Sequence, residues 1–331
     1  MNRISCRLAL TVAACLLPAT AARAVIVYEA PGRLTSLPVL AGGVQPGWQY
    51  VGTAGRFTGI PIGPRAWVTA THLNTTTATL DYANAGTTGT IAYASTRAAT
   101  SGDLAVMVLN ADQPDFTAWA PVWSTTNNLF VAQDVYMYGR GVLRGADVLL
   151  SGTQTGWSWG VDEGNSTPLS YGTNELDYLV SDAGSILLAM QFDQPTEQNG
   201  LPGTEAALAY GDSAGAIFSF NTNTSRWELL GVNYGVDVVR PAPNADYLRA
   251  ALYDTRGYYV YGGPNNNQLI SGTAPIPTVS YATSIPHKYE FLAPYIPVPE
   301  PRGSALLASA AGLLAVARCR RRISFRALTL P

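Results

Sequence analysis

Short apolar runs separated by turn-forming residues dominate the middle of this 331-residue chain. Gly, Asn, Thr and Ser fill the positions between the runs, and Lys is almost absent. Several short strands with Gly-rich turns between them are typical of an all-β sandwich or barrel. The pattern therefore predicts an all-β fold, with strand-like runs at residues 66–70, 104–109, 135–138, 148–150, 186–190, 216–220, 229–234 and 258–261.

Two segments late in the chain depart from the strand pattern. In residues 245–253, Leu248 and Leu252 share one helical face, and Asn244 is a candidate N-cap. We therefore predict a helix there. Residues 262–297 are rich in Pro and Asn. That composition predicts a stalk between the folded domain and the C-terminal segment.

The first 24 residues carry the features of a secretory signal peptide. Arg3 and Arg7 precede an apolar run at residues 8–18, and small residues end the segment at Ala22 and Ala24. Such segments are removed on export. We therefore expect the mature chain to begin near Val25, after cleavage by a signal peptidase.

The C-terminal segment, residues 298–331, has three parts in a fixed order. Val-Pro-Glu-Pro comes first, then an apolar stretch at residues 303–317, then an Arg-rich cluster at 318–322. The apolar stretch is shorter than the ~20 residues that usually span a bilayer. The order resembles the PEP-CTERM sorting signal, which an exosortase-type enzyme recognises and removes, although the tail after residue 322 is a departure. A plain membrane anchor is the alternative. Either way, the sequence predicts an exported protein at the cell surface or outside the cell.

Processing at both ends changes the composition of what remains. The three cysteines, Cys6, Cys15 and Cys319, all lie in the terminal segments, so the mature domain has no disulfide. Between Val25 and Val298 there are ten Arg and one Lys against twenty-one Asp and Glu, a net charge of about −10. This acidity disfavours nucleic-acid binding, which relies on Lys and Arg. The sequence shows no metal-ligand spacing and no nucleotide fingerprint, so we expect no cofactor.

Three short motifs supply a base, a carboxylate and a nucleophile in that order along the chain. They are Thr-Ala-Thr-His ending at His72, Gly-Asp-Leu-Ala-Val around Asp103, and Gly-Asp-Ser-Ala-Gly around Ser213. A serine hydroxyl needs a base within hydrogen-bond reach, and that base needs a third group to fix its tautomer. The only other histidine is His287, which lies in the predicted stalk. The carboxylates that compete with Asp103 have less suitable flanking residues: Asp81, Asp112 and Asp115.

The motifs and their flanks resemble those of trypsin-like serine proteases. The resemblance implies two antiparallel six-stranded β-barrels over residues 25–261, with the active site in the cleft between them. His72, Asp103 and Ser213 would form the catalytic triad. The N–H groups of Gly211 and Ser213 would form the oxyanion hole. The specificity pocket would be formed by Ala207, Asn233 and Gly235.

The resemblance also raises specific questions. The family has glycine where this chain has Ala214, proline at Ala216, and often a cysteine at Leu73. It has a strand near residues 245–253, which is the alternative to the helix predicted there. In the family a freed N-terminus pairs with the carboxylate that matches Asp212, but no clear activation site precedes residue 42.

The function expected from these features is an exported serine endopeptidase acting on proteins or peptides. One alternative is an α/β-hydrolase esterase, since Gly-Asp-Ser-Ala-Gly also fits the Gly-x-Ser-x-Gly nucleophile elbow. That fold needs its acid and histidine after the serine, where only His287 follows. The second alternative is a catalytically inactive, protease-like surface or matrix protein.

Overall fold

The computed structural model describes residues 25–29, 34–35, 38–40, 43–83, 89–126, 133–161, 167–195, 203–261 and 266–297. The predicted signal peptide and sorting segment lie outside these residues. In the part described, no helix is long and apolar enough to cross a membrane. Strands make up nearly all of the regular structure, so the all-β prediction is confirmed.

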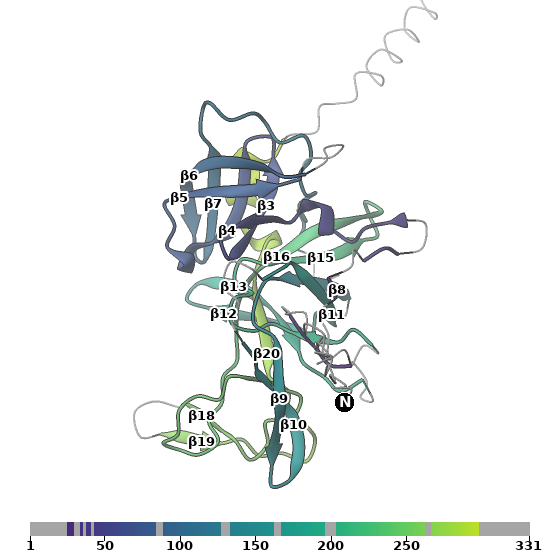
Figure 1. Ribbon diagram of the computed structural model, residues 1–331, viewed down its shortest axis with the longest axis vertical. Coiled ribbons are helices and arrows are strands. Elements are labelled where there is room, and N and C mark those ends of the chain that lie inside the picture. Colours follow the sequence, from purple (N-terminus) through teal and green to yellow (C-terminus); the bar gives the residue numbers. More distant parts are fainter. Residues whose placement is uncertain are drawn as a thin grey trace, which may run out of the picture.

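A closed six-stranded barrel forms the first half of the fold, at the top of Figure 1. Its strands follow one another around the barrel in the order β2, β3, β4, β7, β6, β5. They are β2 (Gly52–Ala54), β3 (Phe57–Gly63), β4 (Ala66–Ala70), β5 (Thr77–Tyr82), β6 (Ile91–Ser101) and β7 (Leu104–Leu109). All five side chains of β4 are buried, as expected for its apolar run.

A seven-stranded antiparallel sheet forms the second half, in the order β11, β8, β15, β16, β20, β13, β12. Where the resemblance implies a second closed six-stranded barrel, the described strands form this larger sheet instead. They are β8 (Asp134–Gly139), β11 (Ser170–Glu175), β12 (Tyr178–Asp182), β13 (Ser185–Gln191), β15 (Ala216–Asn221), β16 (Arg226–Val236) and β20 (Val279–Ser284).

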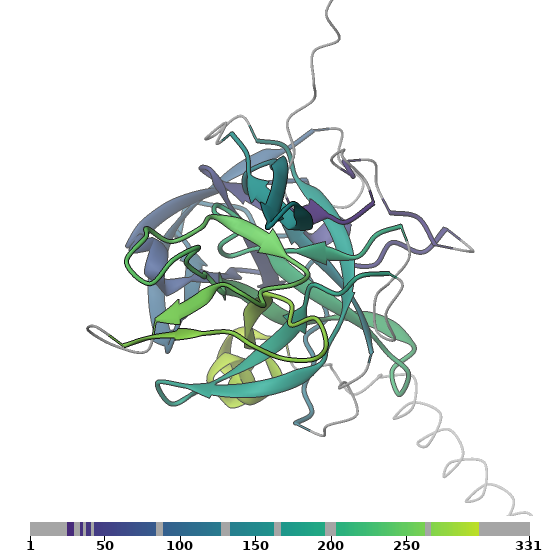
Figure 2. The same cartoon turned by 90° about the horizontal axis from the view of Figure 1, so that it is seen from below.

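A smaller lobe extends from this sheet, at the bottom of Figure 1 and nearest the viewer in Figure 2. It contains the sheet of β9 (Arg144–Leu150), β10 (Thr153–Trp159) and β17 (Ala250–Leu252), and the hairpin of β18 (Tyr259–Tyr261) and β19 (Asn267–Leu269). The helix predicted over residues 245–253 is wrong, because strand β17 pairs there with β10. The strand alternative holds at this position.

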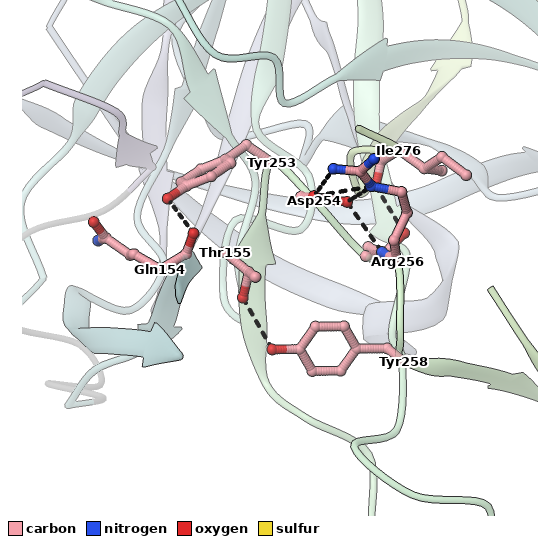
Figure 3. A network of polar contacts seen from close by, with 8 residues as sticks. Gln154, Thr155, Tyr253, Asp254, Arg256, Tyr258 and Ile276 are labelled. Carbon is pink, nitrogen blue, oxygen red and sulfur yellow. Dashed lines mark hydrogen bonds and ion pairs between the residues drawn. The ribbon is translucent and has the colours of Figure 1, made fainter. Parts of the chain in front are cut away.

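Polar contacts join separate parts of the lobe (Figure 3). The Thr155 hydroxyl lies 2.9 Å from the Tyr258 hydroxyl, and both residues are buried. The Tyr253 hydroxyl donates to the carbonyl oxygen of Gln154 at 2.8 Å. These contacts tie β10 to the segment that follows β17.

The prediction of a stalk over residues 262–297 is wrong for most of the residues that the structure describes there. Strand β20 lies inside the seven-stranded sheet, paired with β13 on one side and β16 on the other. The chain then forms η6 (Pro286–Lys288), α1 (Tyr289–Leu292) and η7 (Ala293–Tyr295). Ile285 and Leu292 are fully buried in a core that also contains Val68 of the barrel and Phe218 of the sheet. The folded domain therefore extends well past residue 261.

Three further short elements lie outside these sheets. β1 (Ile26–Val27) pairs with β14 (Ala206–Ala207), and η2 (Trp48–Tyr50) precedes β2. Tyr28, directly after β1, packs its ring against those of Trp157 and Tyr253 at centroid distances of 4.9 and 5.4 Å. The first described residues thus connect the segment before Ser213 with the lobe.

Candidate active site

His72 and Asp103 meet because the strands beside them pair. β4 ends at Ala70 and β7 begins at Leu104, and these two residues are direct antiparallel partners. His72, in the turn η3 (Thr71–Leu73), therefore lies against Asp103. The His72 Nδ1 atom is 2.8 Å from Asp103 Oδ2, and the His72 backbone N–H donates to Oδ1 at 2.9 Å. The carboxylate thus fixes both the ring and the backbone of His72.

Ser213 reaches the same imidazole from the second half of the fold. It lies in the turn between β14 and β15, and its Oγ atom is 2.8 Å from His72 Nε2. The His72 side chain is 37% exposed and that of Asp103 12% exposed. The three predicted residues therefore form one hydrogen-bonded chain whose histidine is open to solvent and whose carboxylate is shielded.

Asn233 on β16 holds the turn that carries Ser213. Its Nδ2 group donates to the carbonyl oxygens of Asp212 at 3.0 Å and Tyr138 at 2.9 Å. Its backbone exchanges two further hydrogen bonds with Ala214 and Gly215. Asn233 is buried, and its Oδ1 atom finds no donor among the described residues. Through these four hydrogen bonds Asn233 ties the nucleophile turn to β8 and β16.

Ala214 shows how the chain departs from the glycine of the resemblance. Its φ is +62°, in the left-handed region that costs a non-Gly residue ~1–2 kcal/mol. The turn therefore keeps the positive φ that glycine adopts readily, and Ala214 is strained there. The hydroxyl of Thr58, on β3 of the barrel, donates to the Ala214 carbonyl oxygen and joins the turn to the first half of the fold.

The residues around Ser213 also present two N–H groups. In the part of the chain that the structure describes, the backbone N–H groups of Gly211 and Ser213 donate to no protein acceptor. Gly211 has a φ of +94°, which glycine adopts readily. The buried Asp212 carboxylate between them accepts hydrogen bonds from the N–H groups of Gly141 at 2.7 Å and Ala209 at 2.8 Å. The resemblance implies that this carboxylate pairs with a freed N-terminus. In this structure two backbone N–H groups bind it.

Two cavities flank the triad. A cavity of about 130 Å³ opens beside Ser213, and its lining includes Asn233 and Gly235 of the predicted specificity pocket. The third predicted member, Ala207, lies outside that lining, because it pairs with Ile26 of β1 and is buried. A second cavity of about 270 Å³ lies beside His72 and Asp103.

The sequence motifs do not predict two aromatic residues that lie near the triad, Tyr234 and Trp159. Tyr234 lies edge-on to His72 with ring centroids 6.3 Å apart, and its hydroxyl donates to Asp182 Oδ2 at 3.2 Å. Burial, with help from Asp182, raises the pKa of Tyr234. Trp159, at the end of β10, lines the cavity beside Ser213. The Trp-Ser-Trp pattern at residues 157–159 signals a half-buried strand, but which site it faces depends on tertiary packing.

The competing residues lie elsewhere. His287 is exposed, and its Nδ1 atom is 2.9 Å from the Ser284 hydroxyl. Partial desolvation of the ring and the nearby Lys288 charge lower the pKa of His287. Asp115 forms an ion pair with Arg65 at 2.6 Å. Among the described residues no group of His, Cys, Asp and Glu is arranged to hold a metal ion.

Comparison with known proteins adds little to this site. No protein-family model matches the chain, and no curated protein matches it by sequence. Solved structures do match, among them the crystal structure of the MamO protease domain from Magnetospirillum magneticum in its apo form. That likeness has a TM-score of 0.36 and 14% sequence identity, and it covers 63% of this chain and 92% of that chain. At this low similarity, the chemistry of the site is inferred from its geometry alone.

The geometry has the parts that nucleophilic acyl transfer requires. A hydroxyl, an imidazole and a carboxylate lie in one hydrogen-bonded chain, with distances of 2.8 Å at both steps. The N–H groups of Gly211 and Ser213, in the same turn as the hydroxyl, have no acceptor among the described residues, and a cavity opens beside Ser213. A hydroxyl activated in this way can attack a carbonyl carbon, while the N–H groups stabilise the resulting oxyanion.

Proposed function

We propose that this protein is an exported serine endopeptidase. The observation that carries the proposal is the contact of His72 Nε2 with Ser213 Oγ at 2.8 Å, with Nδ1 of the same ring held by Asp103. The His72 ring faces Asp103 with Nδ1, so Nε2 is the nitrogen that can accept the serine proton. No metal or cofactor enters this scheme.

The reaction proceeds in two halves. Ser213 Oγ bonds to the carbonyl carbon of the scissile peptide as His72 takes the hydroxyl proton. The N–H groups of Gly211 and Ser213 stabilise the oxyanion, and the C–N bond breaks as His72 returns that proton to the leaving amine. A water molecule then attacks the carbonyl carbon of the acyl ester and gives a proton to His72. The C–O bond to Ser213 breaks as His72 returns that proton to Oγ, which releases the carboxylic acid and free Ser213. Asp103 stabilises the imidazolium in both halves.

The esterase alternative does not fit the fold. An α/β-hydrolase alternates strands and helices and places its histidine after the serine. The described fold is nearly all β, and the histidine that contacts Ser213 is His72, which precedes it. The inactive-protein alternative is decided by experiment.

Labelling with a fluorophosphonate probe tests the proposal. We expect the probe to modify Ser213, located by mass spectrometry, and the wild-type protein to hydrolyse a mixed peptide library. Ser213→Ala and His72→Ala should each abolish both activities with an unchanged circular dichroism spectrum. Ser219→Ala, on β15, is the matched control and should behave as wild type. Absence of wild-type labelling, or wild-type rates in His72→Ala, would contradict the triad.

Export is a separate part of the proposal and rests on the terminal segments of the sequence. The mature protein should begin near Val25 and lack everything after about Pro301. The intact mass of protein from the native host measures both ends at once. A surface-exposed form that still carries the Arg-rich peptide at 318–322 would contradict removal of the tail and favour a membrane anchor.

A further inference from the structure

The cavity beside Ser213 has a wall that comes from outside the two main halves of the fold. Ser213 and Gly211 lie in its lining with Leu208, Ala209 and Val236, and the lobe contributes Trp159. The lining residue Trp159 is the last residue of β10, where it pairs with Arg144 of β9. Its backbone N–H donates to the Arg249 carbonyl oxygen at 2.7 Å. The lobe therefore takes part in shaping the space next to the nucleophile.

The strand that carries Trp159 is firmly anchored. Two residues earlier, Trp157 packs against Tyr28 and Tyr253 at centroid distances of 4.9 and 5.7 Å. The Arg144 guanidinium lies 3.7 Å from the Trp157 ring centroid, and that arginine donates to the Tyr28 carbonyl oxygen at 2.6 Å. Trp159 itself packs against the apolar cluster that contains Ala209. These contacts hold the strand that carries the Trp159 indole in place beside the cavity.

The cavity offers no free charge. Asp212 is the one acidic side chain in its lining, and its carboxylate accepts hydrogen bonds from the N–H groups of Gly141 and Ala209. The remaining side chains of the lining are uncharged. An unpaired cation is costly to bury. A Lys or Arg side chain is therefore a poor occupant.

The cavity is also small. Its volume is about 130 Å³, slightly less than the ~150 Å³ cavity that accommodates benzene. Side chains from Ala to Val or Leu fit this space with room to spare, whereas a Phe or Tyr ring is a tighter occupant. The indole of Trp159 is the largest side chain in the lining, so its truncation removes more side-chain volume than truncation at any other lining position.

We infer that Trp159 is a specificity-determining residue that limits the side chain before the scissile bond to small, uncharged groups. The inference rests on the proposed endopeptidase function, in which that side chain enters the cavity beside Ser213. It assigns the lobe a part in substrate selection, since Trp159 belongs to β10.

A graded series of substitutions tests the inference. Trp159→Phe, Trp159→Leu and Trp159→Ala enlarge the cavity in steps. Peptides that differ only in Ala, Val, Leu, Phe or Arg before the scissile bond give kcat/KM for each variant. Wild type should prefer Val or Leu over both Phe and Arg. The Phe-to-Val ratio of kcat/KM should rise along the series, by about 10-fold or more in Trp159→Ala, with little gain for Arg.

Trp227→Leu is the matched control, because Trp227 lies on β16 and packs against Tyr136, outside the cavity beside Ser213. It should keep the wild-type ratio. Active-site titration with the fluorophosphonate probe normalises each variant to its folded fraction, and Trp159→Phe covers the case in which Trp159→Ala fails to fold. A wild-type preference for Phe or Arg, or a constant Phe-to-Val ratio across the series, overturns the inference. Failure of the proposed function is distinct, because the wild type would then hydrolyse none of the peptides.

Discussion

At the scale of single residues, Asp103 has the most demanding role, because it accepts hydrogen bonds from both the ring and the backbone of His72. Asp103→Asn keeps the shape but places an N–H group toward Nδ1. The imidazole would then adopt the tautomer that cannot take the serine proton. We expect kcat for peptide hydrolysis to fall by about four orders of magnitude with the fold intact.

Steady-state kinetics and circular dichroism measure these two effects. Asp112→Asn is the control, since Asp112 is an exposed carboxylate outside the site, and it should keep wild-type kcat. A loss of less than tenfold in Asp103→Asn would show that another group orients His72.

A second residue-scale prediction concerns stability and pH. Burial raises the pKa of Asp237, although hydrogen bonds from the Tyr281 hydroxyl at 3.0 Å and the Val279 N–H at 3.2 Å partly offset this. Because its folded pKa exceeds its unfolded value, Asp237 contributes stability that is fully present below the unfolded pKa. That stability is lost as the pH rises through the folded pKa.

Asp237→Asn cannot ionise and can still pair with both Tyr281 and Val279. We therefore expect the variant to have a higher free energy of unfolding than wild type at pH 7. The difference should shrink as the pH falls through the raised pKa of the folded state, and it should be lost below about pH 3.8, the ordinary pKa of the carboxyl group. Urea denaturation across this pH range measures the trend, and an advantage that grows toward low pH would contradict it.

At the scale of elements, the end of β8 packs closely against the turn that carries Ser213. A Cβ atom at Gly139 would overlap the Asp212 carboxylate, which the Gly141 N–H also holds. In Gly139→Ala the carboxylate must move, and the Ser213 turn moves with it. We expect a stability loss of ~1–3 kcal/mol, typical of overpacking, together with a large fall in the fluorophosphonate labelling rate.

Gly152→Ala, in the turn between β9 and β10, separates strain from loss of function. Gly152 has a φ of +84° and open space around its Cα, so alanine there is strained but touches nothing. This variant should lose some stability and keep the wild-type labelling rate. Equal labelling rates in Gly139→Ala and wild type would show that the Asp212 position does not control the nucleophile.

The elements also show how far the sequence leads. Apolar runs at residues 66–70 and 104–109 predict β4 and β7, and the pairing of these strands brings His72 to Asp103. Each triad residue stands in a local motif, so the sequence indicates it directly. No local motif indicates Trp159, because its position beside Ser213 depends on how the lobe packs against the rest of the fold.

Strand β20 shows the opposite limit. Its sequence, Val-Ser-Tyr-Ala-Thr-Ser, is half polar and follows a Pro-rich segment, so composition favours a stalk. Yet Ser280, Thr283 and Ser284 are all buried. The Ser280 hydroxyl accepts a hydrogen bond from the Leu208 N–H at 2.9 Å, and strands on both sides satisfy the backbone. Residues 279–284 form a strand because they pair with β13 and β16, which are distant in the sequence. No local sequence pattern predicts this pairing.

At the scale of the whole molecule, residues 279–297 connect the barrel to the seven-stranded sheet. β20 lies between β13 and β16, and the segment after it buries Ile285 and Leu292 in a core shared by barrel and sheet. Each of these side chains contributes ~1.5–3 kcal/mol when fully buried. Without β20, the edges of β13 and β16 lose their partners, and their N–H and C=O groups are left unpaired in the middle of the sheet.

We therefore expect a chain of residues 25–297 to fold, to unfold cooperatively in urea, and to react with the fluorophosphonate probe. A chain of residues 25–278 should show no cooperative transition and no labelling. The comparison separates the two interpretations of this segment, because removal of a stalk would leave both properties intact. Cooperative unfolding of the shorter chain would show that barrel and sheet hold together without β20. The triad would then depend only on the contacts that precede it, among them the hydrogen bond from Thr58 to Ala214.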